Sequence, residues 1–209
     1  MSRPPARGER RVRAARFVVA TLNPDKLREL VALLPDDLGE FAGLAAFAGA
    51  AAPHETGATL EENALLKARA AVALTGLPAI ADDTGLEVDA LGGEPGVRSA
   101  RYAGEGAGYD ANVRKLMRRM EGVEPARRSA RFRTVCVACD PDRPPIVAEG
   151  ALEGRITETP RGAGGFGYDP VFEVAGTGRT LAELSFAEKS ALSHRAAAVA
   201  NLVRKLRET

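Results

Sequence analysis

Residues 16–34 read RFVVATLNPDKLRELVALL, and they decide the fold because a strand passes directly into a helix. The run RFVVAT is apolar and rich in β-branched side chains, which favours a short buried strand. Asn23 is a suitable N-cap, and Pro24 suits the first helical position. The apolar residues that follow recur at helical spacing on one face: Leu27, Leu30, Val31 and Leu34. We therefore predict a strand, a tight turn and a helix.

Further helices and strands follow along the chain. Thr59 and Glu62 form a capping box, and the helix that they begin is predicted to end at Gly76. The run LPAIADD, residues 77–83, indicates a buried strand that ends in two carboxylates before a turn that contains glycine. The other predicted elements are a helix at 110–120, strands at 131–138 and 146–156, and a final helix at 190–206. Helices and strands mixed in this order predict an α/β sheet with flanking helices.

The overall composition limits the class of protein. The chain has 209 residues, of which 45% are hydrophobic and 27% charged, as in ordinary globular proteins. A net charge of +1 argues against a protein that coats nucleic acid, because such proteins carry a strong basic excess. The sequence has neither an apolar run long enough to span a membrane nor the apolar core of a secretory signal. We expect a cytoplasmic protein that binds neither nucleic acid nor a membrane.

The N-terminal residues differ in composition from the rest. Residues 1–15 are rich in arginine and have almost nothing to bury, which predicts a disordered basic tail. Short basic runs also contact phosphates, so a nucleic-acid role for the tail is the alternative. Residues 16–209 are close to the roughly 100 to 200 residues of one domain, so we expect a single domain there.

The two cysteines, Cys136 and Cys139, form a C-x-x-C pattern that is also found in redox and zinc sites. They lie in an apolar, β-branched stretch, where residues three apart on a strand point to opposite faces. This geometry opposes joint metal binding or a disulfide, and the chain has no second pair to complete a zinc site. We expect two buried core cysteines.

The turn TLNPDK is the first candidate site. A strand delivers the chain to a helix N-terminus, where free backbone N–H groups and the positive end of the helix dipole favour anions. The phosphate candidates are Thr21, Leu22, Asn23, Pro24, Asp25 and Lys26. The alternative is that the Asn-Pro pair is simply a good helix start.

The second predicted helix has polar residues within its inward face. The residues at the spacing of one face are Leu60, Asn63, Lys67, Ala71 and Leu74. Lys67 at the edge of such a face also fits an aliphatic stem that packs while its charge reaches water. That explanation does not extend to Asn63, so we favour a binding site on this face.

The adjacent carboxylates Asp82 and Asp83 follow a predicted buried strand, where ligands of open α/β sheets tend to bind. Successive strand residues point oppositely, so we expect the two carboxylates to face different surroundings. The alternative is a pair of acids in a solvated turn. Apolar residues directly before them imply partial burial, which is costly for an unpaired carboxylate. A magnesium ion would offset that cost, and Glu55 is a natural additional ligand.

Two later segments also carry candidates. In GGFGYDP, residues 164–170, glycines let the backbone approach a ligand, and Phe166 and Tyr168 offer ring faces for a flat base. The alternative is that these rings only fill the core. In KSALSHR, residues 189–195, a lysine, a histidine and an arginine gather around the start of a helix. That group equally fits an ordinary surface feature.

Taken in order, these segments resemble the inosine triphosphate pyrophosphatase family, also called noncanonical purine nucleoside triphosphate pyrophosphatases. The matching motifs span residues 17–206. They are T-x-N-x-x-K, E-T-G followed by E-N-A-x-x-K-A, A-D-D-[ST]-G-L, P-G-x-x-S-A-R-Y, G-G-F-G-Y-D-P and E-K-x-x-x-S-H-R. Each motif alone is weak, whereas the ordered series is specific.

The resemblance implies an elongated mixed α/β sheet with flanking helices, two lobes around a central cleft, and a homodimer. It implies that Asp83 accepts a proton, that Asp83 and Glu55 bind magnesium, and that Lys67 and residues 21–26 grip the triphosphate. Thr84 stands where the family commonly has serine. The residues expected around the base are Phe166, Gly167, Tyr168, Asp169, Lys189, His194 and Arg195.

Two positions depart from the family pattern. Leu22 stands where a smaller or polar residue is common, and it is expected to contribute only its backbone. His54 stands where some relatives have a second acid, so it is not included among the metal ligands.

The implied substrate is a purine nucleoside triphosphate, and its charge dictates the chemistry. Magnesium and lysines neutralise the phosphates while a carboxylate removes a proton from the water that attacks the α-phosphorus, and pyrophosphate departs. Selectivity is expected from donors aimed at the 6-oxo group, with Arg195 the first candidate. Adenine has an amino group there, which would leave the donor unpaired.

Two rival functions follow from the same residues. One is a nucleotide pyrophosphatase directed at modified pyrimidines, which a substrate panel separates. The other is a non-catalytic nucleotide or RNA-binding module that uses the basic tail and the glycine loop. It would bind RNA with steep salt dependence and release no pyrophosphate.

Overall fold

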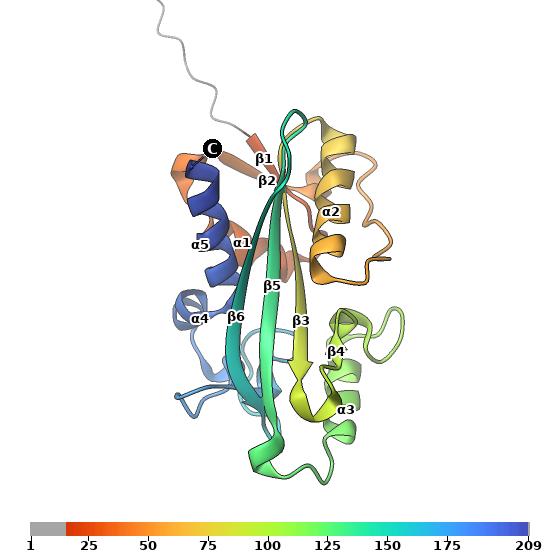
Figure 1. Cartoon of the computed structure of the whole chain (residues 1–209), viewed down its shortest axis with the longest axis vertical. Helices are drawn as coiled ribbons and strands as arrows, with labels where there is room; N and C mark the ends of the chain where they lie inside the picture. The colour runs from red at the N-terminus through yellow and green to blue at the C-terminus, as the bar shows by residue number, and fades with distance from the viewer. Residues whose placement is uncertain (1–15, 209) are drawn as a thin grey trace, which may run out of the picture.

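An elongated mixed sheet forms the spine of the molecule (Figure 1). The structure is a computed structural model that describes residues 16–208, and the predicted tail at 1–15 lies outside the described residues. The strands run in the order β2-β1-β3-β5-β6-β7, with β4 paired to β3. Their bounds are β1 Arg16–Val19, β2 Glu40–Gly43, β3 Ala79–Val88, β4 Pro95–Gly96, β5 Ser129–Cys139, β6 Ile146–Ile156 and β7 Phe172–Val174. The predicted α/β sheet is confirmed.

The sheet is parallel at one end and antiparallel over the rest. β1 pairs in parallel with β2 and, through Val18 and Val19, with the start of β3. β3, β5 and β6 then pair antiparallel as long strands, with β7 at the edge. Since β1 is short, β3 extends well beyond its parallel neighbour, and that step in the sheet is where the cleft described below begins.

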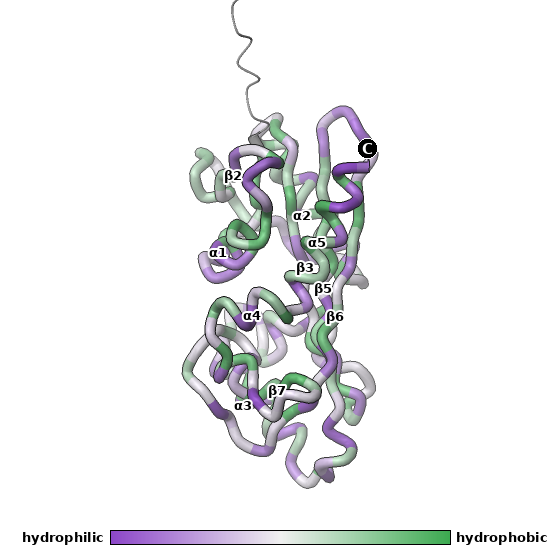
Figure 2. The backbone as a smooth tube through the Cα atoms, turned by 90° about the vertical axis from the view of Figure 1, so that its left-hand side faces the viewer, coloured by the Kyte–Doolittle hydropathy of each residue, from purple (hydrophilic) through white to green (hydrophobic). Residues whose placement is uncertain are grey.

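Helices cover both faces of the sheet. Their bounds are α1 Pro24–Leu33, α2 Leu60–Thr75, α3 Tyr109–Arg119, α4 Phe186–Leu192 and α5 His194–Arg207. Helix α2 packs on β3 and β5, and α5 packs on the opposite face, on β5 and β6 (Figure 1). Figure 2 shows α1 and β2 in the upper half of the molecule and α3, α4 and β7 in the lower half.

The alternation of side chains along β5 divides the core. Val135 and Val137 pack with the apolar face of α2, whereas Cys136 and Ala138 pack with α1 and α5. Farther along the sheet, Phe132 belongs to a third cluster together with residues of α3 and β7. Successive residues of β5 therefore pack into the core on opposite faces of the sheet.

The two cysteines behave as expected for core residues. Cys136 and Cys139 are both free and buried, and they belong to the core clusters on opposite faces of the sheet. Burial raises the pKa of both thiols above the ordinary value, so neither is activated as a thiolate.

The strand predicted at residues 77–83 corresponds to β3, and its predicted end at Asp82 and Asp83 is wrong. β3 continues to Val88, because residues 79–88 pair without interruption with β5, including Asp82 with Cys136 and Asp83 with Val135. The predicted turn is therefore strand, and the two carboxylates lie in its middle. Sequence pattern favoured a turn because Asp and Gly are rare in strands, but long-range pairing outweighs that preference.

The predicted single C-terminal helix is also wrong. The chain forms α4 and α5, which are separated at Ser193 in an extended conformation. The Ser193 side chain accepts a hydrogen bond from the backbone N–H of Ala196, so it caps α5. Helix α4 has its own start, a capping box between Ser185 and Glu188.

Two predicted inward-facing leucine or valine side chains lie at the surface. Val31 is 41% exposed, because the buried face of α1 is centred on Glu29 and Leu30. Leu74 is 43% exposed, because the buried stripe of α2 runs through Ala68 and Ala71. Over residues 16–208, none of the helices has the length and apolar character needed to cross a bilayer.

Gly150 on β6 sets how closely α5 approaches the sheet. A Cβ atom placed there would lie only 2.3 Å from the backbone N of Ala198 and 2.3 Å from the backbone O of His194. Both atoms belong to the first turns of α5. The absent side chain therefore lets the N-terminal end of α5, with His194, lie directly against the sheet.

We expect Gly150→Ala to lower the free energy of unfolding by about 1 to 3 kcal/mol, because the added methyl group must displace α5. Urea denaturation measures the change. Gly108→Ala is the control, since Gly108 has a φ of −73° and a Cβ there meets no atom within 4 Å. Equal losses in the two variants would contradict the assigned contact.

Candidate active site

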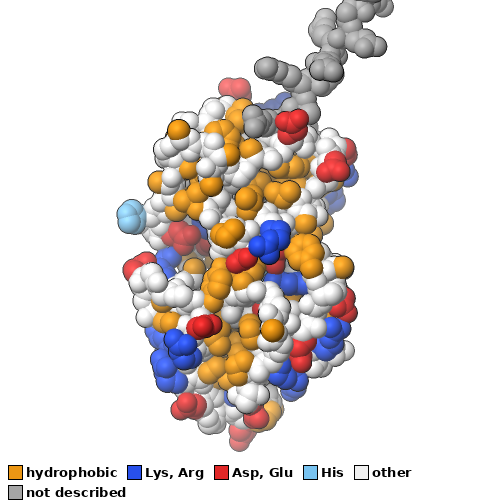
Figure 3. Space-filling model, turned by 180° about the vertical axis from the view of Figure 1, so that it is seen from behind, with side chains coloured by type: hydrophobic (Ala, Val, Ile, Leu, Met, Phe, Trp, Pro, Cys, Tyr) orange, Lys and Arg blue, Asp and Glu red, His pale blue; other side chains and the backbone are white. Residues whose placement is uncertain are grey.

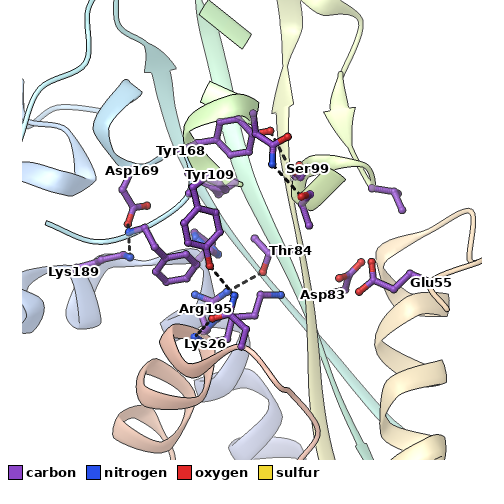
Figure 4. Close-up of a pocket in the computed structure, with 18 residues that line it drawn as sticks. Lys26, Glu55, Asp83, Thr84, Ser99, Tyr109, Tyr168, Asp169, Lys189 and Arg195 are labelled. Atoms are coloured by element: carbon purple, nitrogen blue, oxygen red, sulfur yellow. Dashed lines mark hydrogen bonds and ion pairs between the residues drawn. The ribbon is translucent and has the colours of Figure 1, made fainter. Parts of the chain in front are cut away.

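A pocket opens where β3 extends beyond the end of β1. Asp83 and Thr84 of β3 lie at its base, and residues from α1, α3, α5 and the glycine loop surround them (Figure 4). Figure 3 shows charged side chains of both signs gathered across the middle of the molecule. The lining residues that carry polar groups are Asn23, Lys26, Glu55, Asp83, Thr84, Ser99, Tyr109, Asn112, Tyr168, Asp169, Lys189, His194 and Arg195.

On the α2 face of the sheet, Asp83 lies within a cluster of charges. Lys67 Nζ is 2.7 Å from Asp83 Oδ1 and 2.9 Å from Glu55 Oε1, so both carboxylates converge on one ammonium group. Asn63 Nδ2 donates to Asp83 Oδ2 at 3.3 Å. Arg101 holds Glu55 from the other side at 2.8 Å. The predicted residues Asp83, Glu55 and Lys67 are thus in direct contact.

On the opposite face, Asp82 belongs to a different network. Arg195 Nε donates to Asp82 Oδ2 at 3.0 Å, and Lys26 Nζ lies 3.6 Å from Asp82 Oδ1. Arg195 also pairs with Glu29, which in turn accepts from Lys189 Nζ at 2.6 Å. The expectation that the two aspartates face different surroundings is confirmed, because strand geometry sends them to opposite faces.

These surroundings shift the pKa values of the two aspartates in opposite directions. Burial raises the pKa of Asp83 above its ordinary value, and the positive charge of Lys67 offsets this only in part. Burial also disfavours ionisation of Asp82, but Lys26 and Arg195 outweigh it and hold the pKa of that carboxyl well below its ordinary value. Asp83 is therefore the better proton acceptor, and Asp82 is a fixed negative charge.

The start of α1 differs from the prediction of free backbone donors. The side chain of Asn23 accepts from the N–H groups of Asp25 and Lys26, and the N–H of Leu27 bonds to the backbone O of Asn23. The first turn is therefore capped by its own sequence. This segment therefore contributes the side chains of Asn23 and Lys26 to the pocket rather than free backbone N–H groups.

The glycine loop is a tight turn organised by Asp169. The Asp169 carboxylate accepts from the backbone N–H of Phe166 at 2.9 Å and from Lys189 Nζ at 2.6 Å. Gly165 has a φ of +71°, and a Cβ there would lie 2.0 Å from Asp169 Oδ2, so the turn requires glycine. Gly167 follows at the pocket wall, and Tyr168 is buried with its hydroxyl donating to the backbone O of Ser99.

The Lys189, His194 and Arg195 group is buried rather than superficial. Arg195 is 2% exposed and His194 is 3% exposed, although both are in the first turn of α5. Lys189 Nζ lies 4.7 Å from the Phe166 ring centroid, and Arg195 Cζ lies 5.9 Å from it. Lys189 and Arg195 are therefore both close enough to the Phe166 ring for cation–π interactions.

The structure brings together most, but not all, of the predicted site residues. Thr21, Leu22, Pro24 and Asp25 belong to the turn before α1 and its first residues but do not line the pocket, and Leu22 is 44% exposed. The other predicted residues line the pocket or, like Lys67, contact a residue that does.

Sequence reasoning missed several residues that complete the site. Glu29 pairs with both Lys189 and Arg195, yet it occupies an ordinary charged position of an amphipathic helix. Tyr109 at the start of α3 accepts a hydrogen bond from Asn23 Nδ2 at 2.8 Å, and its ring lies 5.7 Å from that of Phe166. Thr134 on β5 contacts Thr84 and His194. Glu29 lies outside the apolar face that the spacing predicted for this helix, so its burial had no periodic signal.

The donor set at Asp83 suits a hard divalent cation. Asp83 and Glu55 already share one cationic group, which shows that their oxygens converge. Residues 16–208 contain no group of three or more His, Cys, Asp or Glu side chains arranged to hold a metal alone. Magnesium is usually held by one or two carboxylates together with substrate phosphates, so the residues present fit it.

The comparisons with known proteins agree with one another. The model of the Ham1 family matches residues 17–205. The dITP/XTP pyrophosphatase of Methylococcus capsulatus is 52% identical over 194 residues, covering 92% of this chain and 96% of that protein. The Shigella flexneri protein of the same name is 50% identical, covering 92% and 98%. The structure of a HAM1 protein from Coxiella burnetii has a TM-score of 0.84 at 42% identity, covering 93% and 100%.

We expect Asp82→Asn to destabilise the metal-free protein by about 3 to 5 kcal/mol at neutral pH, because Arg195 loses its buried carboxylate partner. Since the folded pKa of Asp82 is depressed, its stabilising effect is full above the unfolded value of about 3.9 and is lost as pH falls below it. Urea denaturation from neutral to acidic pH measures this.

The difference in the free energy of unfolding between Asp82→Asn and the unmodified chain should therefore become smaller at acidic pH. Asp36→Asn, at an exposed position, is the control and should change little at any pH. A difference that does not depend on pH would contradict the assigned ion pair.

Proposed function

Because the chain belongs to the Ham1 family, we propose that it hydrolyses noncanonical purine nucleoside triphosphates to the monophosphate and pyrophosphate. The substrates are the triphosphates of inosine, deoxyinosine and xanthosine. Relatives about half identical to this chain over nearly its whole length carry the name dITP/XTP pyrophosphatase. The resemblance seen in the sequence motifs points to the same family.

One observation supports this reaction above the others. Asp83 and Glu55 meet the ammonium group of Lys67 at 2.7 and 2.9 Å, in the same cleft as the cation-lined ring of Phe166. A carboxylate of raised pKa beside cations is suited to deprotonating water next to a polyanion. An aromatic face at the other end of the cleft suits a purine. A phosphate-cleaving centre and a base site are thus joined in one cleft.

Asp83 acts as the proton acceptor in this proposal. Lys67 binds its Oδ1 and Asn63 binds its Oδ2, so the carboxylate is held in one orientation. The water that attacks the α-phosphorus gives its proton to Asp83. Lys26 and Lys67 bind the phosphate oxygens, and their positive charge counters the repulsion between the triphosphate and the attacking oxygen.

Asp83 and Glu55 would also hold magnesium. The bound ion supplies charge neutralisation of the triphosphate and of the departing pyrophosphate. Lys67, which contacts both carboxylates, is also placed to bind the substrate phosphates.

The purine base is placed at the Phe166 end. Lys189 and Arg195 supply N–H donors around the Phe166 ring, and these groups have no acceptor lone pairs of their own. A 6-oxo purine offers an acceptor to them, whereas adenine offers an amino donor. This mismatch is the physical basis for excluding adenosine triphosphate.

We further propose, from the family resemblance, that residues 16–209 act as one two-lobed domain and that the protein is a cytoplasmic homodimer. Light scattering of the purified chain measures the oligomeric state directly, and a monomer would contradict the dimer.

We expect pyrophosphate release from the triphosphates of inosine and xanthosine to exceed that from adenosine triphosphate by about 10⁴-fold in kcat/KM. Removal of magnesium with a chelator should abolish the reaction in every case. Preferential cleavage of a modified pyrimidine triphosphate would instead favour the rival enzyme. RNA binding without pyrophosphate release would favour the non-catalytic module.

We expect Asp83→Asn to lower kcat by about 100-fold or more, because the proton acceptor is lost while the side chain keeps its size. Pyrophosphate release from inosine triphosphate measures the effect, and circular dichroism checks the fold. Asp142→Asn, at an exposed position, should retain full activity. Turnover by Asp83→Asn at the rate of the unmodified chain would remove Asp83 from this role.

A further inference from the structure

A row of hydrogen bonds runs beneath the pocket from Arg195 to His194. Arg195 Nη2 donates to Thr84 Oγ1 at 3.2 Å, and Thr84 Oγ1 lies 2.8 Å from Thr134 Oγ1. Thr134 Oγ1 lies 2.6 Å from His194 Nδ1. Thr134 is fully buried on β5, and neither the sequence motifs nor the proposed function gives it a role.

The direction of these bonds follows from the donors available. A guanidinium group can only donate, so Thr84 accepts from Arg195 and has one proton left to give. Its possible acceptors are Thr134 Oγ1 at 2.8 Å and Asp82 Oδ2 at 3.3 Å. A hydroxyl that donates to a carboxylate normally lies at about 2.5 to 2.7 Å, so 3.3 Å is long for that bond.

We take the shorter contact as the stronger bond, which places the Thr84 proton toward Thr134 and makes Asp82 the weaker acceptor. Thr134 then has its own proton free for its other neighbour, His194 Nδ1 at 2.6 Å. An imidazole nitrogen that accepts a hydrogen bond carries no proton, so in a neutral ring the proton is on Nε2.

We propose that Thr134 is a positioning residue that fixes His194 as the Nε2–H tautomer, so that the ring presents a donor to an acceptor atom of the purine base. This role rests on the proposed function, which supplies the identity of the ligand as a purine nucleotide. His194 contacts the base in this scheme, and Thr134 acts through it.

The surroundings of His194 make the tautomer decisive. Burial, together with the positive charges of Arg195 and Lys189, lowers the pKa of His194 well below its ordinary value, so the ring is neutral and has a single N–H. Phe132 stacks on it with ring centroids 4.7 Å apart and planes at 25°. A neutral imidazole held in one plane offers either a donor or an acceptor at Nε2, and the partner of Nδ1 decides which.

Nε2 itself is open to the pocket. Among the described residues, no hydrogen-bond partner of Nε2 is found, and it does not belong to the buried polar atoms that lack a partner. His194 lines the pocket, so this nitrogen is available to a ligand. A donor there pairs with the carbonyl oxygen of a 6-oxo purine and opposes the amino group of adenine.

Nitrogen-15 NMR of the ligand-free protein tests the tautomer without reference to catalysis. The chain has only two histidines, and His54→Gln removes the exposed one, so the remaining signals belong to His194. We expect the pattern of a neutral ring protonated at Nε2. A proton on Nδ1 would overturn the proposal. Because no substrate is present, this result stands apart from whether the chain releases pyrophosphate.

Substitution at Thr134 tests its role. Thr134→Val keeps the shape but removes the hydroxyl, so we expect mixed tautomers and a loss of about tenfold in the kcat/KM ratio of inosine over adenosine triphosphate. Thr134→Ser restores the hydroxyl and should restore both the NMR pattern and the ratio.

Urea denaturation separates this effect from a loss of folding. If Thr134→Val does not fold, the NMR pattern of the unmodified chain and the rescue by Thr134→Ser still decide the matter. A folded Thr134→Val protein with the tautomer and substrate ratio of the unmodified chain would overturn the proposal.

Discussion

The buried ion pair between Asp82 and Arg195 is the interaction on which the rest of the site depends. Arg195 is 2% exposed and Asp82 is equally buried, so each charge is tolerated only because the other is present. Glu29 extends the pair to α1, and Lys189 extends it to α4 and the glycine loop. One charge network therefore joins β3, α1, the glycine loop, α4 and α5 around a single cleft.

This network also explains why two adjacent aspartates have different properties. Asp82 faces Arg195 and Lys26, which keep it ionised, whereas Asp83 faces Lys67 and Asn63 near the cleft. The alternation of a continuous strand separates them by one residue and by the thickness of the sheet. A fixed charge that holds the fold and a carboxylate suited to proton transfer are thus obtained from one dipeptide.

Much of the fold and part of the site could be predicted from local patterns. The capped helices at Asn23 and Thr59 and the long apolar strands follow from side-chain spacing and capping chemistry. The continuation of β3 through Asp82 could not be predicted in this way, because acidic residues and glycine locally favour a turn. The ten residue pairs that β3 forms with β5 outweigh that local preference. The break at Ser193 was missed because helical periodicity on both sides conceals a cap.

The sequence by itself determined the family, the order of the elements and most residues that meet in the cleft, because short motifs carry that information locally. Only the tertiary structure decided what each side chain faces. Glu29 and Thr134 look ordinary in sequence, yet pairing across more than 50 residues makes one a partner of Arg195 and the other a neighbour of His194. Such contacts depend on sheet register and helix packing, which no local pattern encodes.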